Sequence, residues 1–365
     1  MIDKLRERKL KNTRISVKPF VYSIPSISSV SIRFLILLGI QLIMLLISGS
    51  YNAFLVVIIS LLGSISAAAV NYYVRKEPLY NIMNIAIQGI FIGLLLPETY
   101  PHSMVFVISF TTILISRSII FKGVNSWINI PAIAVIIAWY IGNTYFPQFV
   151  VNSEILTLRN SSVYLIQSGY FPTYSFDSPV TAFLNKYIFS ITNVTIPEGF
   201  VSLLWDSNSI IPAFRFNLIT IISSIIVFSD NAFSVIIPSV FLAVYGLLVR
   251  IFVPYLFGGN FNQGDILLAF LTSGVLFSAV FLIQWYGTTP VTVLGKSILG
   301  IFTGIVAFAI IGCGTSPVGI FYTILCSNII CMIIRIFEEK RNELATAKVV
   351  SKYSAKVAAE TGVQK

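Results

Sequence analysis

The sequence predicts an all-α integral membrane protein with about ten transmembrane helices, arranged as two inverted halves of five helices each. Three observations support this fold class. The chain of 365 residues is 56% hydrophobic and only 10% charged, and its mean hydropathy is +0.88. Apolar stretches recur on both sides of one long polar segment, and basic residues gather near the two ends. This composition is typical of chains whose surface faces lipid.

The apolar stretches have the length of membrane helices. A bilayer core about 30 Å thick is crossed by about 20 apolar residues in a helix. We predict helices over about 32–49, 53–74, 82–97, 104–121, 127–147, 214–229, 233–253, 266–284, 294–312 and 316–337. Because an odd number of helices precedes the polar segment, the second half must cross the membrane in the opposite sense to the first. That reversal is typical of an inverted repeat.

These stretches divide the chain into five parts. They are a basic cytoplasmic N-terminal segment, 1–31; a first half, 32–147; a large extracytoplasmic loop, 148–212; a second half, 213–337; and a basic cytoplasmic tail, 338–365. Lys and Arg accumulate on the cytoplasmic side of membrane proteins. We therefore expect both termini in the cytoplasm. Arg250, near the outer end of a predicted helix, is an exception to this charge bias.

Several functional classes are disfavoured by the residues present. The net charge of +10 comes from basic residues near the ends, so membrane topology accounts for it and we expect no nucleic-acid partner. No dinucleotide-binding fingerprint opens a strand–helix unit. The cysteines (Cys313, Cys326 and Cys331) show no Cys-x-x-Cys spacing. We read them as buried apolar residues and expect no metal site.

Two prolines fall within the predicted helices or at their edges. Proline removes a backbone hydrogen bond and clashes with the preceding turn, at a cost of about 3 kcal/mol in a helix interior. Broken helices at membrane depth are tolerated where they are buried in protein. We therefore expect Pro97 and Pro290 at helix breaks that face protein.

Four stretches carry a family resemblance. Thr289–Gly300, which reads TPVTVLGKSILG, resembles the SPVTxxGKxxxG signature of the RnfD/NqrB family. Members of that family are membrane subunits of ion-translocating, flavin-based electron-transfer complexes. Gly93–Pro97 with Pro101 resembles the family's GLLLPxxxP. Weaker likenesses occur at Phe121-Lys122-Gly123 with Pro131-Ala132, and from Ser316-Pro317-Val318-Gly319 to Asn328. The resemblance covers about residues 30–337 in order.

The resemblance implies a cofactor in the polar segment. Family members attach FMN through its phosphate to a threonine in a motif that ends Ser/Thr-Gly-Ala-Thr. The match here is Ser178-Pro179-Val180-Thr181, preceded by Asp177. We expect covalent FMN at Thr181 on an exposed turn, beside Ser178 and Asp177, with the bond made by a flavin transferase. The sequence departs from the motif at Pro179 and Val180, and an ordinary turn without a cofactor is the alternative.

The resemblance also implies a function. It describes an RnfD-like subunit of an Rnf/Nqr-type complex in the bacterial cytoplasmic (inner) membrane, with the lipid bilayer and other subunits as partners. The subunit would pass electrons through flavin, coupled to Na⁺ or H⁺ transport, without independent catalytic activity. A second, non-covalent flavin is left open. Two other readings also remain: an inverted-repeat channel or transporter for a small polar solute, and a flavin-less scaffold subunit of the same complex.

Overall fold

The structure is a computed structural model that describes residues 26–75, 82–116, 127–147, 153–158, 161–192, 195–229, 232–285, 288–312 and 316–361. These residues form helices and turns and no strand, which confirms the all-α class. Most of the basic N-terminal segment lies outside the described residues, as do Cys313 and the stretch Phe121-Lys122-Gly123.

Five helices are long and apolar enough to cross a membrane: α2 (Ile27–Ile47), α3 (Tyr51–Arg75), α12 (Ile236–Leu256), α15 (Val293–Ile311) and α16 (Gly319–Thr361). Four apolar helices are shorter: α4 (Ile82–Leu95), α5 (His102–Ile115), α6 (Ile130–Gly142) and α11 (Asn217–Phe228). Each falls on a stretch predicted to be a membrane helix. The multi-pass character is therefore clear, whereas the count of ten spans stays a prediction.

The stretch predicted as one helix over 266–284 is broken. It consists of α13 (Ile266–Thr272), α14 (Val275–Phe277) and a π-helical turn, η6 (Ser278–Leu282). The break lies at Gly274, whose φ of 71° is left-handed. Two buried asparagine side chains donate hydrogen bonds to backbone carbonyls of the broken helix. Asn217 Nδ2 donates to Leu271 O and Asn129 Nδ2 donates to Leu282 O, each at 2.9 Å. Such partners are what makes a break tolerable away from water.

The two prolines lie at helix ends. Pro97 is buried and follows the end of α4. Pro290 is buried among residues 288–292, which are not helical and precede α15. Both prolines are therefore buried where helices end, as expected, whereas their position inside a membrane stays a prediction. Neither ring has to be accommodated inside a regular helix, where it would cost about 3 kcal/mol.

The two halves pack in matching ways. In the first half α3 contacts α4 and α5, and in the second half α12 contacts α13 and α15. Across the boundary α2 contacts α11, and α6 contacts α16. An inverted repeat predicts this pattern, because helices equivalent by position meet each other near the pseudo-symmetry axis.

Aromatic rings fill part of the boundary between the halves. Phe34 of α2 and Phe91 of α4 meet Phe281 of η6 and Trp285, which follows it. Their ring centroids lie 5.4 to 6.5 Å apart, mostly edge to face, and each side chain is at most 3% exposed. Such contacts add about 1 kcal/mol per pair beyond burial. This part of the boundary is therefore apolar and closely packed.

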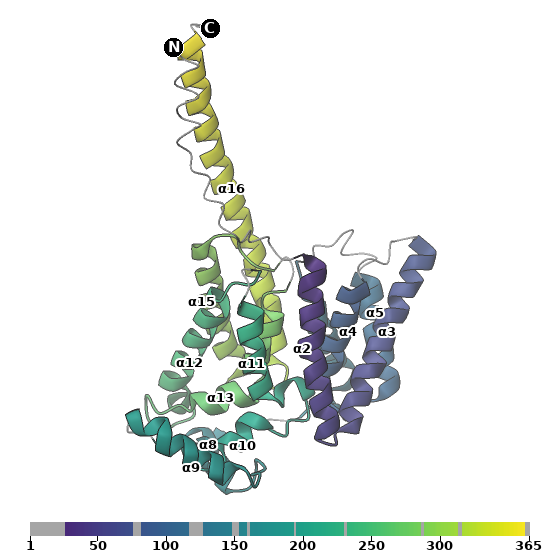
Figure 1. Cartoon of the computed structure of the whole chain (residues 1–365), viewed down its shortest axis with the longest axis vertical. Coiled ribbons are helices and arrows are strands. Elements are labelled where there is room, and N and C mark those ends of the chain that lie inside the picture. Colours follow the sequence, from purple (N-terminus) through teal and green to yellow (C-terminus); the bar gives the residue numbers. More distant parts are fainter. Residues whose placement is uncertain are drawn as a thin grey trace, which may run out of the picture.

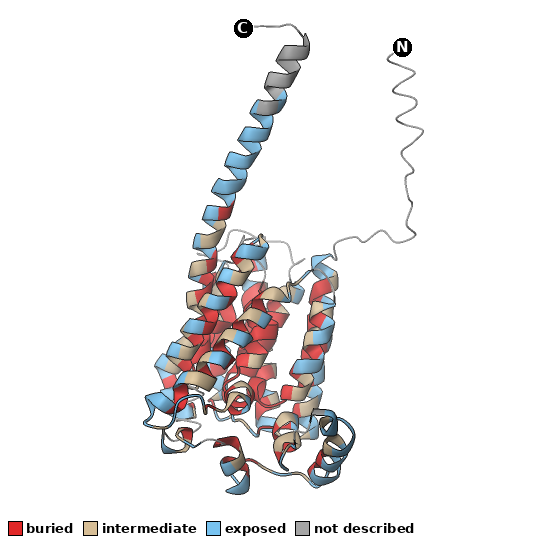
Figure 2. Ribbon diagram, turned by 90° about the vertical axis from the view of Figure 1, so that its left-hand side faces the viewer, coloured by how far each residue is buried: buried red, intermediate tan, exposed pale blue. Residues whose placement is uncertain are grey.

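The longest helix that the structure describes extends beyond the rest of the bundle (Figure 1). α16 has 43 residues, and its C-terminal part projects beyond the other helices (Figure 1). This projecting part is largely exposed (Figure 2). At its base the carboxylate of Glu338, 8% exposed, accepts hydrogen bonds from the backbone N–H groups of Val291 (2.8 Å) and Thr292 (2.9 Å) and from the Thr292 hydroxyl. Thr292 in turn accepts from Gly295 N and so caps α15. Residues of the signature stretch thus fasten α15 to α16.

The predicted loop over 148–212 forms short helices where it is described. They are α7 (Ser153–Leu156), α8 (Ser161–Gln167), α9 (Asp177–Tyr187), η4 (Phe189–Thr192) and α10 (Phe200–Trp205), with η5 (Pro212–Phe214) leading into α11. Figure 1 shows α8, α9 and α10 gathered at one end of the bundle, opposite the projecting part of α16. We call α7 to α10, with their connections, the short-helix module.

The break at Gly274 yields a first prediction. A Cβ added there would overlap the ring of Phe214, and the positive φ adds strain. Gly49 has a similar φ of 75° but nothing within 4 Å. We expect Gly49→Ala to lower the free energy of unfolding by about 1 kcal/mol, the cost of the left-handed conformation. Gly274→Ala should lose about 3 kcal/mol, because overpacking adds to that cost. Denaturation of both variants in detergent measures the difference, and equal losses would contradict the packing at Phe214.

Candidate functional site

The residues Asp177 to Thr181 lie in a helix. They form the first turns of α9, where proline is tolerated, because the N–H groups of a first turn have no helical partner. The expected exposed turn is therefore wrong. Thr181 is only 2% exposed, and its hydroxyl donates to Asp177 Oδ1 at 3.0 Å, one helical turn earlier.

The carboxylate of Asp177 joins α9 to α10 within the short-helix module. Its Oδ1 also accepts from Gly199 N at 2.7 Å, and its Oδ2 accepts from Ser202 N at 2.5 Å and from Ser202 Oγ at 2.6 Å. Gly199 precedes α10, so a carboxylate of α9 occupies the orphan N–H groups at the start of α10. With the bond from Thr181, all four donors converge on a side chain that is 3% exposed.

These hydrogen bonds set the charge state of Asp177. Burial alone would raise the pKa of the carboxyl, but hydrogen bonds from the Ser202 side chain, from the backbone N–H groups of Gly199 and Ser202, and from Thr181 outweigh it. The net effect is a pKa below the ordinary value of 3.8. Each donor favours the ionised form, because only that form leaves both oxygens free to accept. Asp177 is thus a buried anion at neutral pH.

The third predicted site residue points elsewhere. Ser178 is exposed, and its hydroxyl donates to Glu198 Oε1 at 2.8 Å. The structure therefore brings Asp177 and Thr181 together and places Ser178 on the outer face of α9. Aromatic residues of the segment pack on one another: Tyr174 stacks on Phe176 at 5.5 Å, and Phe176 meets Trp205 edge to face at 5.9 Å.

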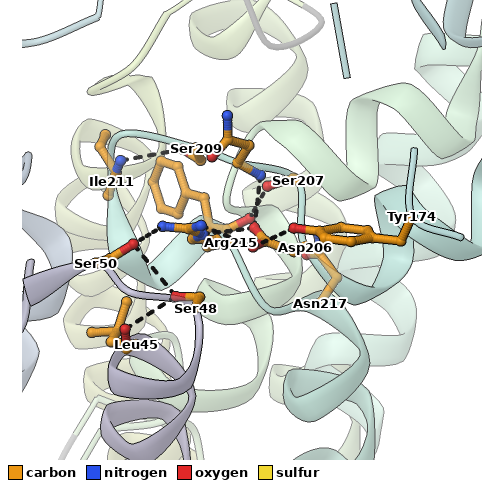
Figure 3. Close-up of polar contacts among 12 residues, drawn as sticks. Leu45, Ser48, Ser50, Tyr174, Asp206, Ser207, Ser209, Ile211, Arg215 and Asn217 are labelled. Atoms are coloured by element: carbon orange, nitrogen blue, oxygen red, sulfur yellow. Dashed lines mark hydrogen bonds and ion pairs between the residues drawn. The ribbon is translucent and has the colours of Figure 1, made fainter. Parts of the chain in front are cut away.

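A buried ion pair anchors the module to the membrane helices (Figure 3). Arg215, just before α11, donates from Nε to Asp206 Oδ1 at 2.7 Å and from Nη2 to Asp206 Oδ2 at 2.9 Å. The two residues are 8% and 1% exposed. Nη1 donates to Ser50 Oγ, in the turn between α2 and α3, and Tyr174 donates to Asp206 Oδ2 at 3.2 Å. Bidentate, charge-assisted geometry of this kind is among the strongest hydrogen bonding in proteins.

Sequence reasoning missed this ion pair. The signal was present, because Asp206 and Arg215 stand nine residues apart on either side of the apolar stretch Ile210–Phe214. In a chain with so few charges, two opposite charges close to predicted membrane helices could have been paired. The partners Ser50 and Tyr174 carry no such signal, because they come from distant parts of the chain.

The residues around Thr181 do not fit a phosphoester in the arrangement described. An esterified Oγ1 has no hydrogen to donate, so the bond to Asp177 would be lost. The phosphate would also sit next to the Asp177 carboxylate, and like charges at that distance repel each other. The side chain is 2% exposed, so a flavin could not be reached from solvent without moving α9.

The carboxylate network yields a second prediction. Asp177→Asn replaces an acceptor-only group by one that brings its own donors toward Ser202 and Gly199. We expect the short-helix module to lose about 2 kcal/mol or more of local stability. Ser178→Ala is the matched control and should change little, because that hydroxyl is exposed. Hydrogen exchange of the peptides that cover 177–205 measures the opening of the module.

The same network predicts a pH dependence. Because the pKa of Asp177 is lowered in the folded state, its stabilising contribution is present above the ordinary value of 3.8 and is lost as the pH falls through the lower folded value. Exchange protection of the module in the parent protein should therefore fall below about pH 4. Asp177→Asn should lack this transition. A transition of the same size in both proteins would assign it to another group.

Comparison with known proteins identifies the family of the chain. A model of the NQR2, RnfD, RnfE family matches residues 14–343, which include both helical halves and the segment between them. No curated protein matches the chain. The matched range covers most of the chain and includes the stretch Thr289–Gly300. The chain belongs to the NQR2, RnfD, RnfE family and is an RnfD/NqrB-like membrane subunit.

Proposed function

We propose that the chain is the D-like membrane subunit of an Rnf/Nqr-type ion-translocating oxidoreductase complex. In that role it passes electrons through flavin, coupled to Na⁺ or H⁺ transport, together with the other subunits. The observation that carries this proposal is the family match over residues 14–343. Electron transfer would be the chemistry of the bound flavin, and the protein would supply position and electrostatics.

Two features of the chain suit a subunit that holds a group at one end of a membrane bundle. The Arg215–Asp206 pair fixes the short-helix module to the turn between α2 and α3. Asp177 fixes α9 to α10 within the module. Rigid support of this kind keeps a site in one geometry.

Covalent FMN at Thr181 stays a prediction, as does a second, non-covalent flavin. Because the folded module buries the Thr181 hydroxyl, attachment requires a flavin transferase that acts before α9 packs onto α10, or an opening of α9. The same burial favours a second candidate function, a flavin-less scaffold subunit of the same complex. In that reading Thr181 is a structural donor to Asp177.

We further propose that the protein lies in the bacterial cytoplasmic membrane with both termini in the cytoplasm. The basic residues near the two ends of the sequence support this orientation. It is also supported by the placement of the short-helix module opposite the projecting part of α16 (Figure 1).

Cysteine labelling tests the orientation. Ser175 and Thr346 are both exposed, one in the module and one in the projecting part of α16. In a background where Cys313, Cys326 and Cys331 are replaced by serine, Ser175→Cys should react with an impermeant maleimide added to intact cells. Thr346→Cys should react only after the membrane is opened. Reaction of both residues from the same side would contradict the proposed topology.

Intact mass tests the flavin. The full chain, co-expressed with a flavin transferase, should gain the mass of one FMN. Thr181→Ala should abolish the gain, and Ser175→Ala, at an exposed position outside the motif, is the control that should keep it. If burial limits attachment, Asp177→Asn should raise the modified fraction, because it loosens the packing of α9 on α10 that buries Thr181. A parent chain that gains no mass would leave the scaffold as the better function.

A further inference from the structure

Arg250 is an exception to the charge bias that lies within a long apolar helix. It lies in α12 near the end of the bundle that carries the short-helix module, and it is half-buried. A long arginine at a helix end can simply extend toward water. Here the side chain is held, because Nη1 donates to the carbonyl of Gly264 at 3.0 Å.

The chain around Gly264 holds that carbonyl in place. Gly264 N donates back to Arg250 O at 3.0 Å, and Asn262 N donates to Ile251 O at 3.1 Å. The loop approaches α12 so closely that a Cβ on Gly264 would overlap the carbonyl of Val249. The guanidinium is therefore positioned in advance, which lowers the entropy cost of binding a ligand.

Arg250 lines a cavity of about 460 Å³. The cavity lies between α8, the segment before α10, the end of α12 and the start of α13. Its lining combines the guanidinium and the exposed Thr195 with apolar side chains that include Val163, Phe200 and Ile266. A cationic group beside an apolar wall suits a ligand with an anionic end and an apolar body.

The acid in the same cavity, Asp265, is engaged by backbone and serine donors and forms no ion pair with Arg250. Asp265 caps α13 by accepting from Leu268 N at 3.0 Å, and it accepts from Ser162 N at 2.9 Å and from the Ser162 hydroxyl. Among the residues that the structure describes, Arg250 forms no ion pair. A guanidinium has five N–H donors, and Gly264 accepts from one nitrogen only.

We propose that this cavity binds a phosphate group carried on an apolar body, with Arg250 as its bidentate donor. The planar fork of a guanidinium matches two phosphate oxygens. The cavity lies at the end of the membrane bundle, so the phosphate can come from a phospholipid headgroup or from a water-soluble monoester such as FMN. The proposal does not depend on covalent flavin at Thr181.

The test uses the purified full chain and two matched pairs of probes. Phosphatidylglycerol is compared with diacylglycerol by native mass spectrometry, and FMN with riboflavin by equilibrium dialysis. Within each pair only the first carries phosphate. We expect the phosphate-bearing member of at least one pair to bind, and Arg250→Gln to weaken that binding by about tenfold or more. Lys186→Gln, an exposed cation on α9, is the matched control and should bind like the parent.

A second variant separates loss of the ligand site from loss of fold. Val163→Trp fills the cavity from α8 and leaves Arg250 in place, so it should lose the same binding. An Arg250-dependent preference for phosphatidylglycerol over diacylglycerol identifies a lipid site, and one for FMN over riboflavin identifies a site for a soluble monoester. The proposal is overturned if neither preference is found, or if Arg250→Gln binds both phosphate-bearing probes like the parent.

Discussion

The buried pair of Arg215 and Asp206 is the interaction on which the relation between module and membrane helices depends. Replacing such a pair by apolar residues often costs little, whereas removing one partner costs about 3–5 kcal/mol, because the other charge stays buried and unpaired. The pair matters here because it lies where three parts of the chain meet. The pair joins the segment before α11, the turn between α2 and α3, and Tyr174 of the module. These three parts cannot shift independently while both charges remain satisfied.

The sequence predicted where the apolar helices lie, because an apolar stretch of the required length is a strong and local signal. It failed where partners are distant in the chain. The eighth predicted helix breaks at Gly274, where the ring of Phe214, sixty residues earlier, leaves no room for a side chain. Thr181 was expected on an exposed turn because Pro179 is turn-forming. Yet proline also suits the first turn of a helix, and the contacts of Asp177 with Gly199 and Ser202 draw that helix inward.

In the candidate site, too, local features could be predicted from the sequence and contacts between distant residues could not. Asp177 and Thr181 could be placed together from their spacing in a helix, had the segment been read as one, because residues four apart lie on one face. Arg250 could be noted as an exception to the charge bias but not as the wall of a cavity. That role depends on Gly264 and on the module packing beside it. Thr292 and Gly295 were recognised from the signature stretch, but their structural role was not. Thr292 accepts from Gly295 N and so caps α15, and its hydroxyl donates to the Glu338 carboxylate.

α16 has one further mechanical consequence. At 1.5 Å per residue, its 43 residues form a rod about 65 Å long, roughly twice the thickness of a bilayer core. No proline interrupts it, so it has no built-in hinge. Glu338 fastens it to the start of α15 close to where it leaves the bundle. The Glu338 carboxylate is therefore the point through which a tilt of the projecting part would reach Val291 and Thr292, at the start of α15.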